Sequence, residues 1–240
     1  MDYTYGSQEA QAYKETRLPY TNVADFLLTY ISSNKFLDAG CGTGNDLLEI
    51  YRRKGYKGYG CDRSSDMLEV AKSVDCATDL RQADLDKEFP FNLDFDCIYA
   101  HDVIHHLKDP SVFIKNAFNH LTTGKVLIIG TETEEDLKAK FTSRYFPSAL
   151  GIDLARYSKL AEMEKLIKEA GFAEFEVNKL DDNKPMDDTI MQQVRKRAHS
   201  ILGLISDQDF SEGLAKLEKD YADGKLQQMP WNYTLIVAKK

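Results

Sequence analysis

Residues 36–45 read Phe36-Leu37-Asp38-Ala39-Gly40-Cys41-Gly42-Thr43-Gly44-Asn45, and this stretch decides the fold. A short apolar run ends at Asp38, three glycines follow at alternate positions, and an amphipathic stretch begins near Asn45. Glycine adopts backbone conformations that are closed to other residues, and it lets a ligand approach the main chain directly. The first N–H groups of a helix have no partner within it, so they point at whatever occupies the turn. The pattern predicts a strand, a glycine turn and a helix that together bind a cofactor.

The spacing of the glycines narrows the kind of cofactor. A dinucleotide site has the pattern Gly-x-Gly-x-x-Gly, with the pyrophosphate on the helix N-terminus. Here the third glycine comes one residue early, as Gly40-x-Gly42-x-Gly44, and Asp38 precedes the first glycine by two residues. A carboxylate at that place repels a pyrophosphate and suits a cofactor that carries an ammonium and a sulfonium group. A glycine turn with no bound cofactor is the alternative.

The segment Asp38-Ala39-Gly40-Cys41-Gly42-Thr43-Gly44 resembles the first motif of the class I S-adenosylmethionine-dependent methyltransferases. The resemblance implies a Rossmann-like fold, S-adenosyl-L-methionine as cofactor and S-adenosyl-L-homocysteine as product. The resemblance extends over roughly residues 13–130. Within the family, the sequence is similar to the small-molecule branch that includes quinone-biosynthesis methyltransferases. The cofactor-binding candidates in this motif are Asp38, Ala39, Gly40, Gly42 and Gly44.

The strand predicted over residues 56–61 ends in an acid. Asp62 lies about twenty residues beyond the glycine turn, where a βαβ unit presents a carboxylate to ribose hydroxyls. Asp62-Arg63-Ser64-Ser65-Asp66-Met67-Leu68 closely resembles the family's second segment and opens a predicted helix. Arg63 and Met67 are therefore further cofactor candidates, with the soft sulfur of Met67 on the adenine ring. A place for Met67 in the helix core is the alternative.

A third acid follows the strand predicted over residues 78–83. The resemblance implies that an aspartate at this point, Asp84, accepts a hydrogen bond from the adenine amino group, and that its neighbour Leu85 packs on the ring. The alternative is an acid in a surface loop. Because Asp38, Asp62 and Asp84 all follow strands, we expect them at one edge of the sheet.

Three histidines follow the strand predicted over residues 95–100. His101 comes directly after this strand and is expected to face the transferred methyl group, and His101 or His105 is the candidate to accept a proton from a hydroxyl acceptor. His106 completes a His-His-Leu segment that recurs in the family, where one histidine is often structural. A metal site is not expected, because the segment reads as a connection from strand to helix and no supporting carboxylates accompany it.

The alternation of strands and helices predicts an α/β fold with a doubly wound, seven-stranded, mostly parallel sheet. Strands are expected at 36–38, 56–61, 78–83, 95–100, 125–130, 172–180 and 233–238. Predicted helix boundaries include an N-cap at Asp109, an N-cap at Ser158 and a stop at Gly171.

Three segments lie outside the minimal pattern. Residues 1–34 are expected to form an N-terminal helical cap on a methyltransferase domain of residues 35–240. The cap contains a Tyr…Arg-x-Pro segment, which resembles a segment that closes over the cofactor in the family. Insertions at about 131–157 and 181–229 are expected to cover the substrate. The cap contributes the cofactor candidates Tyr13 and Arg17. The insertions contribute the candidates for binding an anionic acceptor, namely Arg144, Tyr145, Arg156 and Arg197. Solvated helix faces and ion pairs are the alternative for these basic residues.

Composition limits the partners. The chain has 240 residues, a formal net charge of −8 and 42% hydrophobic residues, enough for one full core. The acidic balance argues against a broad nucleic-acid surface. There is no apolar run of about 20 residues and no signal peptide is expected, and the four cysteines lack paired spacing, so we expect a cytoplasmic protein with reduced thiols, as a monomer or homodimer.

The sequence therefore predicts an S-adenosylmethionine-dependent enzyme that methylates a small organic molecule by in-line attack on the sulfonium methyl group. The attacking atom stays open among nitrogen, oxygen, sulfur and carbon. Two alternatives remain. One is a catalytically silent regulator that binds S-adenosylmethionine or S-adenosylhomocysteine, and the other is a nicotinamide-dependent oxidoreductase, which the early third glycine opposes.

Overall fold

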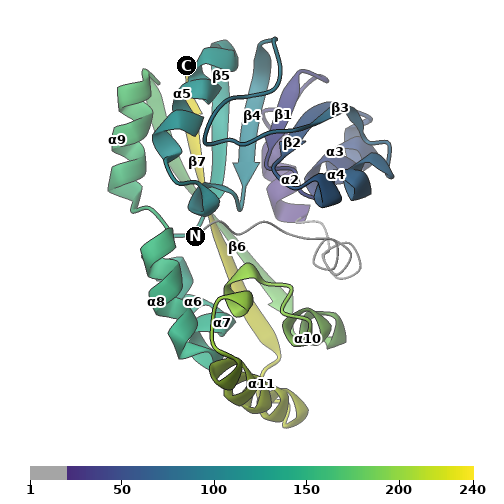
Figure 1. Cartoon of the computed structure of the whole chain (residues 1–240), viewed down its shortest axis with the longest axis vertical. Coiled ribbons are helices and arrows are strands. Elements are labelled where there is room, and N and C mark those ends of the chain that lie inside the picture. Colours follow the sequence, from purple (N-terminus) through teal and green to yellow (C-terminus); the bar gives the residue numbers. More distant parts are fainter. Residues whose placement is uncertain (1–20) are drawn as a thin grey trace.

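The computed structural model of the chain describes residues 21–240, apart from the side chains of residues 182–184 and 229–231. Its centre is one seven-stranded sheet with the order β3-β2-β1-β4-β5-β7-β6 (Figure 1). The first five strands of the chain pair in parallel, and β7 runs antiparallel to both β5 and β6. This confirms the doubly wound, mostly parallel sheet. The strands are β1 (Phe36–Ala39), β2 (Gly58–Asp62), β3 (Ala77–Gln82), β4 (Phe95–His101), β5 (Leu121–Thr131), β6 (Glu174–Pro185) and β7 (Gln228–Lys239).

Helices cover both faces of the sheet, and each face has its own hydrophobic cluster. On one face lie α2 (Thr21–Leu27), α3 (Asn45–Lys54) and α4 (Ser65–Lys72), and on the other lie α5 (Pro110–His120) and α9 (Leu160–Ala170) (Figure 1). Successive residues of a strand point to opposite faces. Accordingly Phe36 belongs to the first cluster and Leu37 to the second.

Local sequence explains most helix ends. Gly55 ends α3 with φ 70° and donates its N–H to Tyr51 O, and Gly171 ends α9 with φ 106°. The Ser64 hydroxyl accepts from Met67 N at the start of α4, and the Asp109 carboxylate accepts from Ser111 N before Pro110. The predicted Ser158 cap is wrong, because α9 begins one residue later and its N-cap position, Lys159, makes no capping hydrogen bond through its side chain.

The two insertions form a second layer of helices. The first contains α6 (Glu134–Ala139), α7 (Phe141–Tyr145) and α8 (Pro147–Arg156), and the second contains α10 (Asp188–Arg195), the 3₁₀ turn η2 (Ser200–Gly203) and α11 (Asp207–Ala222). All of these helices lie around one end of the long antiparallel strand pair formed by β6 and β7, the end that extends beyond the rest of the sheet (Figure 1). Both strands are longer than predicted, so part of the second insertion is strand and not cover.

The two insertions contact each other through α7 and α11. The Phe146 ring stacks on the Phe210 ring with 5.8 Å between centroids, and Tyr145 donates its hydroxyl hydrogen to Asp220 at 3.0 Å. Gly213 makes the close approach possible, because a Cβ there would lie 2.4 Å from the Phe146 ring. Within residues 21–240, no helix is both long enough and apolar enough to cross a membrane.

Candidate active site

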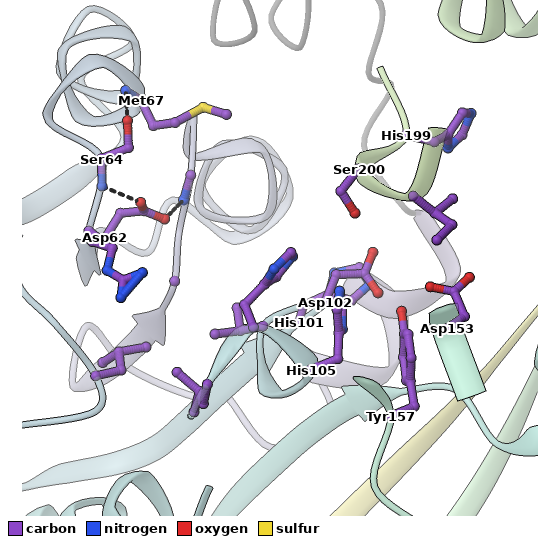
Figure 2. A pocket seen from close by; sticks show the side chains of 18 of the residues that line it. Asp62, Ser64, Met67, His101, Asp102, His105, Asp153, Tyr157, His199 and Ser200 are labelled. Atoms are coloured by element: carbon purple, nitrogen blue, oxygen red, sulfur yellow. Dashed lines mark hydrogen bonds between the residues drawn. The ribbon is translucent and has the colours of Figure 1, made fainter. Parts of the chain in front are cut away.

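A cavity of about 190 Å³ lies at the carboxyl ends of the parallel strands and extends under the inserted helices. Figure 2 shows its two halves. Asp62, Ser64 and Met67 lie on one side, and Asp102, Asp153, Tyr157, His199 and Ser200 lie on the other. His101 stands between them. We call the side with Asp62 the cofactor half and the side with Tyr157 the acceptor half.

Asp62 fixes the glycine turn in the cofactor half. Its Oδ2 accepts the N–H of Gly42 at 2.8 Å, and its Oδ1 accepts the N–H of Ser64 at 2.8 Å. Burial raises the pKa of Asp62, although the hydrogen bonds from Ser64 and Gly42 lower it in part. The Asp62 carboxylate therefore links the glycine turn after β1 to the end of β2. These two strand ends lie at the same edge of the sheet, where the sequence analysis expects them.

The glycines leave the turn open to a ligand. Gly42 has φ 51°, and a Cβ on it would meet no atom within 4 Å, so its backbone borders free space in the cavity. Gly40 has φ 86°, and a Cβ there would lie 2.3 Å from Cγ2 of Val103. An exposed main chain with free space above it fits a cofactor that lies directly on the turn.

The adenine candidates line the same half. Met67 and Leu85 are buried and border the cavity together with Arg63 and Asp84. Burial alone would raise the pKa of Asp84, but the neighbouring Lys87 at 3.2 Å and the N–H of Asp86 lower it below its ordinary value. The residues present therefore fit an adenosyl group, with carboxylates for its hydroxyl and amino groups and apolar side chains for its ring.

Asp86 is a further acid in this wall that the sequence reading did not select. Its Oδ1 accepts the N–H groups of Lys108 at 2.8 Å and Asp109 at 3.1 Å. Among the described residues its buried Oδ2 has no hydrogen-bond partner. It clamps the loop that carries Asp84 and Leu85 to the start of α5.

Asp38 lies behind the cavity wall and not in it. It is 3% exposed, and burial together with the nearby Asp46 raises its pKa well above the ordinary value. Neither Asp38 nor its neighbour Ala39 is among the residues that line the cavity, and Gly44 is not either. These three residues therefore lie on the side of the turn away from the cavity, whereas Gly40 and Gly42 border the cavity.

His101 is held by a buried carboxylate from α3. Its Nδ1 lies 2.8 Å from Oδ2 of Asp46. Burial would lower the pKa of His101, but Asp46, Asp102 and Asp38 outweigh it and raise the pKa to about 9. The rings of His101 and Tyr233 form a T-shaped pair with 5.2 Å between centroids. An imidazole that stays protonated at neutral pH is a hydrogen-bond donor and not a proton acceptor, which argues against the predicted base role of His101.

Aromatic rings and carboxylates form the acceptor half. The rings of His105 and Tyr157 stack at 4.2 Å with an interplanar angle of 16°. Burial, with nearby His106 and Arg156, lowers the pKa of His105 well below the ordinary value, so its ring is neutral. Asp102 has the left-handed φ of 57°, and one of its carboxylate oxygens accepts the hydroxyl of Tyr233 at 3.3 Å.

The basic groups around the acceptor half are paired with acids. Lys140 pairs with the buried Glu132. Arg156 lies 3.5 Å from Asp153 and 3.3 Å from Nδ1 of His106. Within residues 21–240, the ion pairs include none between Asp102 and a lysine or arginine.

Most of the predicted substrate candidates lie away from the cavity. Arg144 is exposed over the ring of Tyr145, whose hydroxyl is used by Asp220. Arg197 pairs with Asp207 at 2.6 Å and stacks over Phe210. Arg156 alone approaches the site, behind Asp153 and His106. The predicted cofactor residues Tyr13 and Arg17 lie outside the described residues.

The sequence reading missed several residues of the site. Asp102 follows His101 directly and was available to the same argument from strand ends. Asp46, Asp153, Tyr157 and His199 reach the site through helix packing and carry no local motif. Within residues 21–240, no group of three or more His, Cys, Asp or Glu residues is arranged to hold a metal ion.

A family model described as "Methyltransferase domain" matches residues 11–177. A segment of 144 residues is 28% identical to phosphoethanolamine N-methyltransferase 1 of Zea mays, and the match covers 58% of this chain but only 28% of that protein.

Two solved structures show the fold at low sequence identity. The "Putative methyltransferase from antibiotic biosynthesis pathway" of Anabaena variabilis has a TM-score of 0.73 at 18% identity, with 94% of this chain and 99% of that chain covered. Phosphoethanolamine N-methyltransferase 2 of Haemonchus contortus, in complex with phosphomonomethylethanolamine and S-adenosylhomocysteine, has a TM-score of 0.60 at 19% identity, with 98% and 58% covered. Similarity to the quinone-biosynthesis branch stays a prediction. The chain therefore belongs to the methyltransferase domain family, whose cofactor is S-adenosylmethionine.

Proposed function

We propose that this chain transfers the methyl group of S-adenosylmethionine to the nitrogen of a small amine. The observation that carries the proposal is the make-up of the acceptor half, where the Asp102 carboxylate stands among the rings of His105, Tyr157 and Tyr233. A carboxylate attracts an ammonium group, and aromatic faces bind amine cations at about 0.5–2 kcal/mol each. The relatives from Zea mays and Haemonchus contortus are also named as N-methyltransferases.

The charges near the acceptor half favour a cation over an anion. Lys140 and Arg156 are paired with Glu132 and Asp153, so their charges are already balanced. His105 is neutral and does not repel a cation. Since Arg144 and Arg197 lie elsewhere, the proposal does not include the anionic acceptor that the basic residues first suggested.

The chain contributes alignment to the reaction. S-adenosylmethionine supplies an activated methyl group on its sulfonium when it is bound. The glycine turn and Asp62 hold the adenosyl part, and Asp102 holds the amine on the far side of His101. Such positioning contributes several kcal/mol of barrier lowering, of the order of 7–11 kcal/mol at best. The atom that attacks is the lone pair of a neutral nitrogen, so an acceptor that arrives as an ammonium loses its proton before methyl transfer.

The test measures S-adenosylhomocysteine formation by the purified chain with five small acceptors, namely a primary amine, a secondary amine, a phenol, a thiol and a carboxylic acid. We expect turnover with an amine and product methylated on nitrogen. Asp102→Asn should lower kcat/KM for the amine by about 10- to 100-fold, because a hydrogen-bonded charge is worth about 1.5–3 kcal/mol. The matched control is Glu164→Gln, an exposed acid of α9 paired with Lys168, which should behave as wild type.

Methylation of oxygen, sulfur or carboxylate alone would refute an amine acceptor. Tight binding of S-adenosylhomocysteine with no turnover on any of the five would favour the silent regulator instead. Binding of NAD in place of S-adenosylhomocysteine in a thermal-shift assay would favour the oxidoreductase.

A further inference from the structure

Asp46 is a buried acid whose role the cofactor and acceptor halves do not explain. It lies in the first turn of α3, two residues after the last glycine of the turn, and is 8% exposed. It does not line the cavity, yet its Oδ2 lies 2.8 Å from Nδ1 of His101, which is 55 residues away in the chain. Both side chains are about nine-tenths buried. Burying a carboxylate costs free energy unless it is paired, so we expect the role of Asp46 to be its contact with His101.

We propose that Asp46 is a positioning residue for methyl transfer, which holds the His101 imidazole in one orientation at the boundary between the cofactor half and the acceptor half. The proposal rests on the function proposed above for the same cavity.

The ring of His101 is restrained from three elements. Asp46 fixes the Nδ1 side from α3. Tyr233 of β7 forms a T-shaped pair with the ring at an interplanar angle of 72°. The backbone of Gly130 on β5 lies close to the ring, because a Cβ at this position would be only 3.0 Å from Cδ2 of His101. A hydrogen bond to one ring nitrogen decides what the other nitrogen offers, and these contacts restrict how the ring can turn.

The charges that face His101 agree with a donor role. They come from Asp46 on α3, Asp38 on β1 and Asp102 at the end of β4, and all three favour the protonated ring, while Tyr233 of β7 is a further titratable neighbour among the described residues. Their combined effect outweighs burial and holds the pKa of His101 at about 9. Both ring nitrogens then carry hydrogen at neutral pH, and the N–H on Nδ1 donates to Asp46.

Asp46 also connects His101 to the glycine turn. Gly44 N–H donates to Cys41 O at 2.8 Å, and Leu48 N–H donates to Gly44 O at 2.9 Å. The turn that carries the cofactor therefore sets the start of α3, and with it the place of Asp46. Through Asp46, the cofactor half therefore positions the His101 ring, which borders the acceptor half.

The test compares Asp46→Asn with the matched variant Glu49→Gln in the full-length protein. Glu49 lies one turn farther along α3, pairs with Arg53 and is outside the site. The first measurement is the NMR titration of His101 in protein labelled at histidine. We expect the apparent pKa of His101 to fall from about 9 in the wild type toward its ordinary value in Asp46→Asn, and to stay unchanged in Glu49→Gln.

The second measurement separates catalysis from binding. Asp46→Asn should lower kcat by about 10- to 100-fold, as expected for a displaced catalytic-site ring. The affinity for S-adenosylhomocysteine in calorimetric titration should change by less than about threefold. Asp46→Glu should restore part of the kcat and of the raised His101 pKa.

An unchanged His101 titration in Asp46→Asn would overturn the proposal, and so would an unchanged kcat. Equal losses in Asp46→Asn and Glu49→Gln would show a general effect on α3 and overturn it as well. The histidine titration needs no acceptor, so a wild-type chain that methylates no amine would refute the proposed function while the titration still decides the role of Asp46.

Discussion

Replacing Asp62 with alanine tests the cofactor half most directly. A carboxylate has about four lone-pair sites, and the structure uses two of them for the N–H groups of Gly42 and Ser64. Two sites remain, which is the number that a vicinal diol requires. We therefore expect Asp62 both to hold the glycine turn and to accept both ribose hydroxyls of the cofactor.

The magnitude follows from these contacts. A hydrogen bond to a charged group contributes about 1.5–3 kcal/mol, so losing two to the ribose should cost about 3–6 kcal/mol of binding free energy. Because 1.4 kcal/mol is tenfold in affinity, Asp62→Ala should weaken S-adenosylhomocysteine binding by about 10²- to 10⁴-fold. The unfolding free energy should fall too, by about 1–3 kcal/mol for the N–H of buried Ser64, which loses its acceptor.

Calorimetric titration with two ligands separates the two roles of Asp62. The ligands are S-adenosylhomocysteine and its 2′,3′-dideoxy analogue, each measured against wild type and Asp62→Ala. If Asp62 binds the diol, removing the hydroxyls should cost the wild type far more than the variant, and the difference is the coupling free energy. Equal costs in both proteins would show that Asp62 acts only on the turn, and the ribose assignment would be lost.

Two further predictions concern stability. Gly40→Ala should lower the unfolding free energy by about 2 kcal/mol or more in urea denaturation, because its Cβ would lie 2.3 Å from Val103 at a left-handed φ, and adding Val103→Ala should recover only the steric part. The second concerns pH, since burial and Arg156 lower the pKa of His106 from 6.5 to about 4, which favours the neutral ring in the folded chain. This contribution is fully present above pH 6.5 and is lost as pH falls toward 4, by about 3 kcal/mol in all. His106→Gln should flatten the stability curve over that range, and a curve identical to that of the wild type would contradict the assignment.

The cofactor half could be predicted from sequence because each of its parts is local. A glycine turn, an acid after a strand and a helix cap each depend on a few neighbouring residues. The parallel order then brings the strand ends to one edge, which is how Asp62 and Asp84 come to line the same cavity. Asp38 behaves differently, because a position after a strand places an acid at the edge of the sheet but does not decide whether it faces the ligand or the core, and Asp38 is buried behind the cavity.

The rest depends on contacts between segments far apart in the chain. The last part of β6 is polar in sequence and is predicted as a loop, but it pairs with β7 at the edge of the sheet. The basic residue Arg197 stood out in an acidic chain, but its charge is used against Asp207 on the helix surface. Charge contrast by itself does not distinguish a ligand-binding residue from one that pairs with its neighbours.

The acceptor half is built jointly by the two insertions. Tyr157 follows α8 in the first insertion, whereas His199 and Ser200 belong to the second, and both sets line the same space. Their relative placement depends on the packing of α7 against α11, where Gly213 lets the helix approach Phe146. The cofactor half is built from the ends of the parallel strands and the acceptor half from the insertions, so the insertions can change the acceptor while the glycine turn keeps its geometry. The amine proposal accordingly depends on side chains from these packed helices and on Asp102, and the cofactor assignment does not.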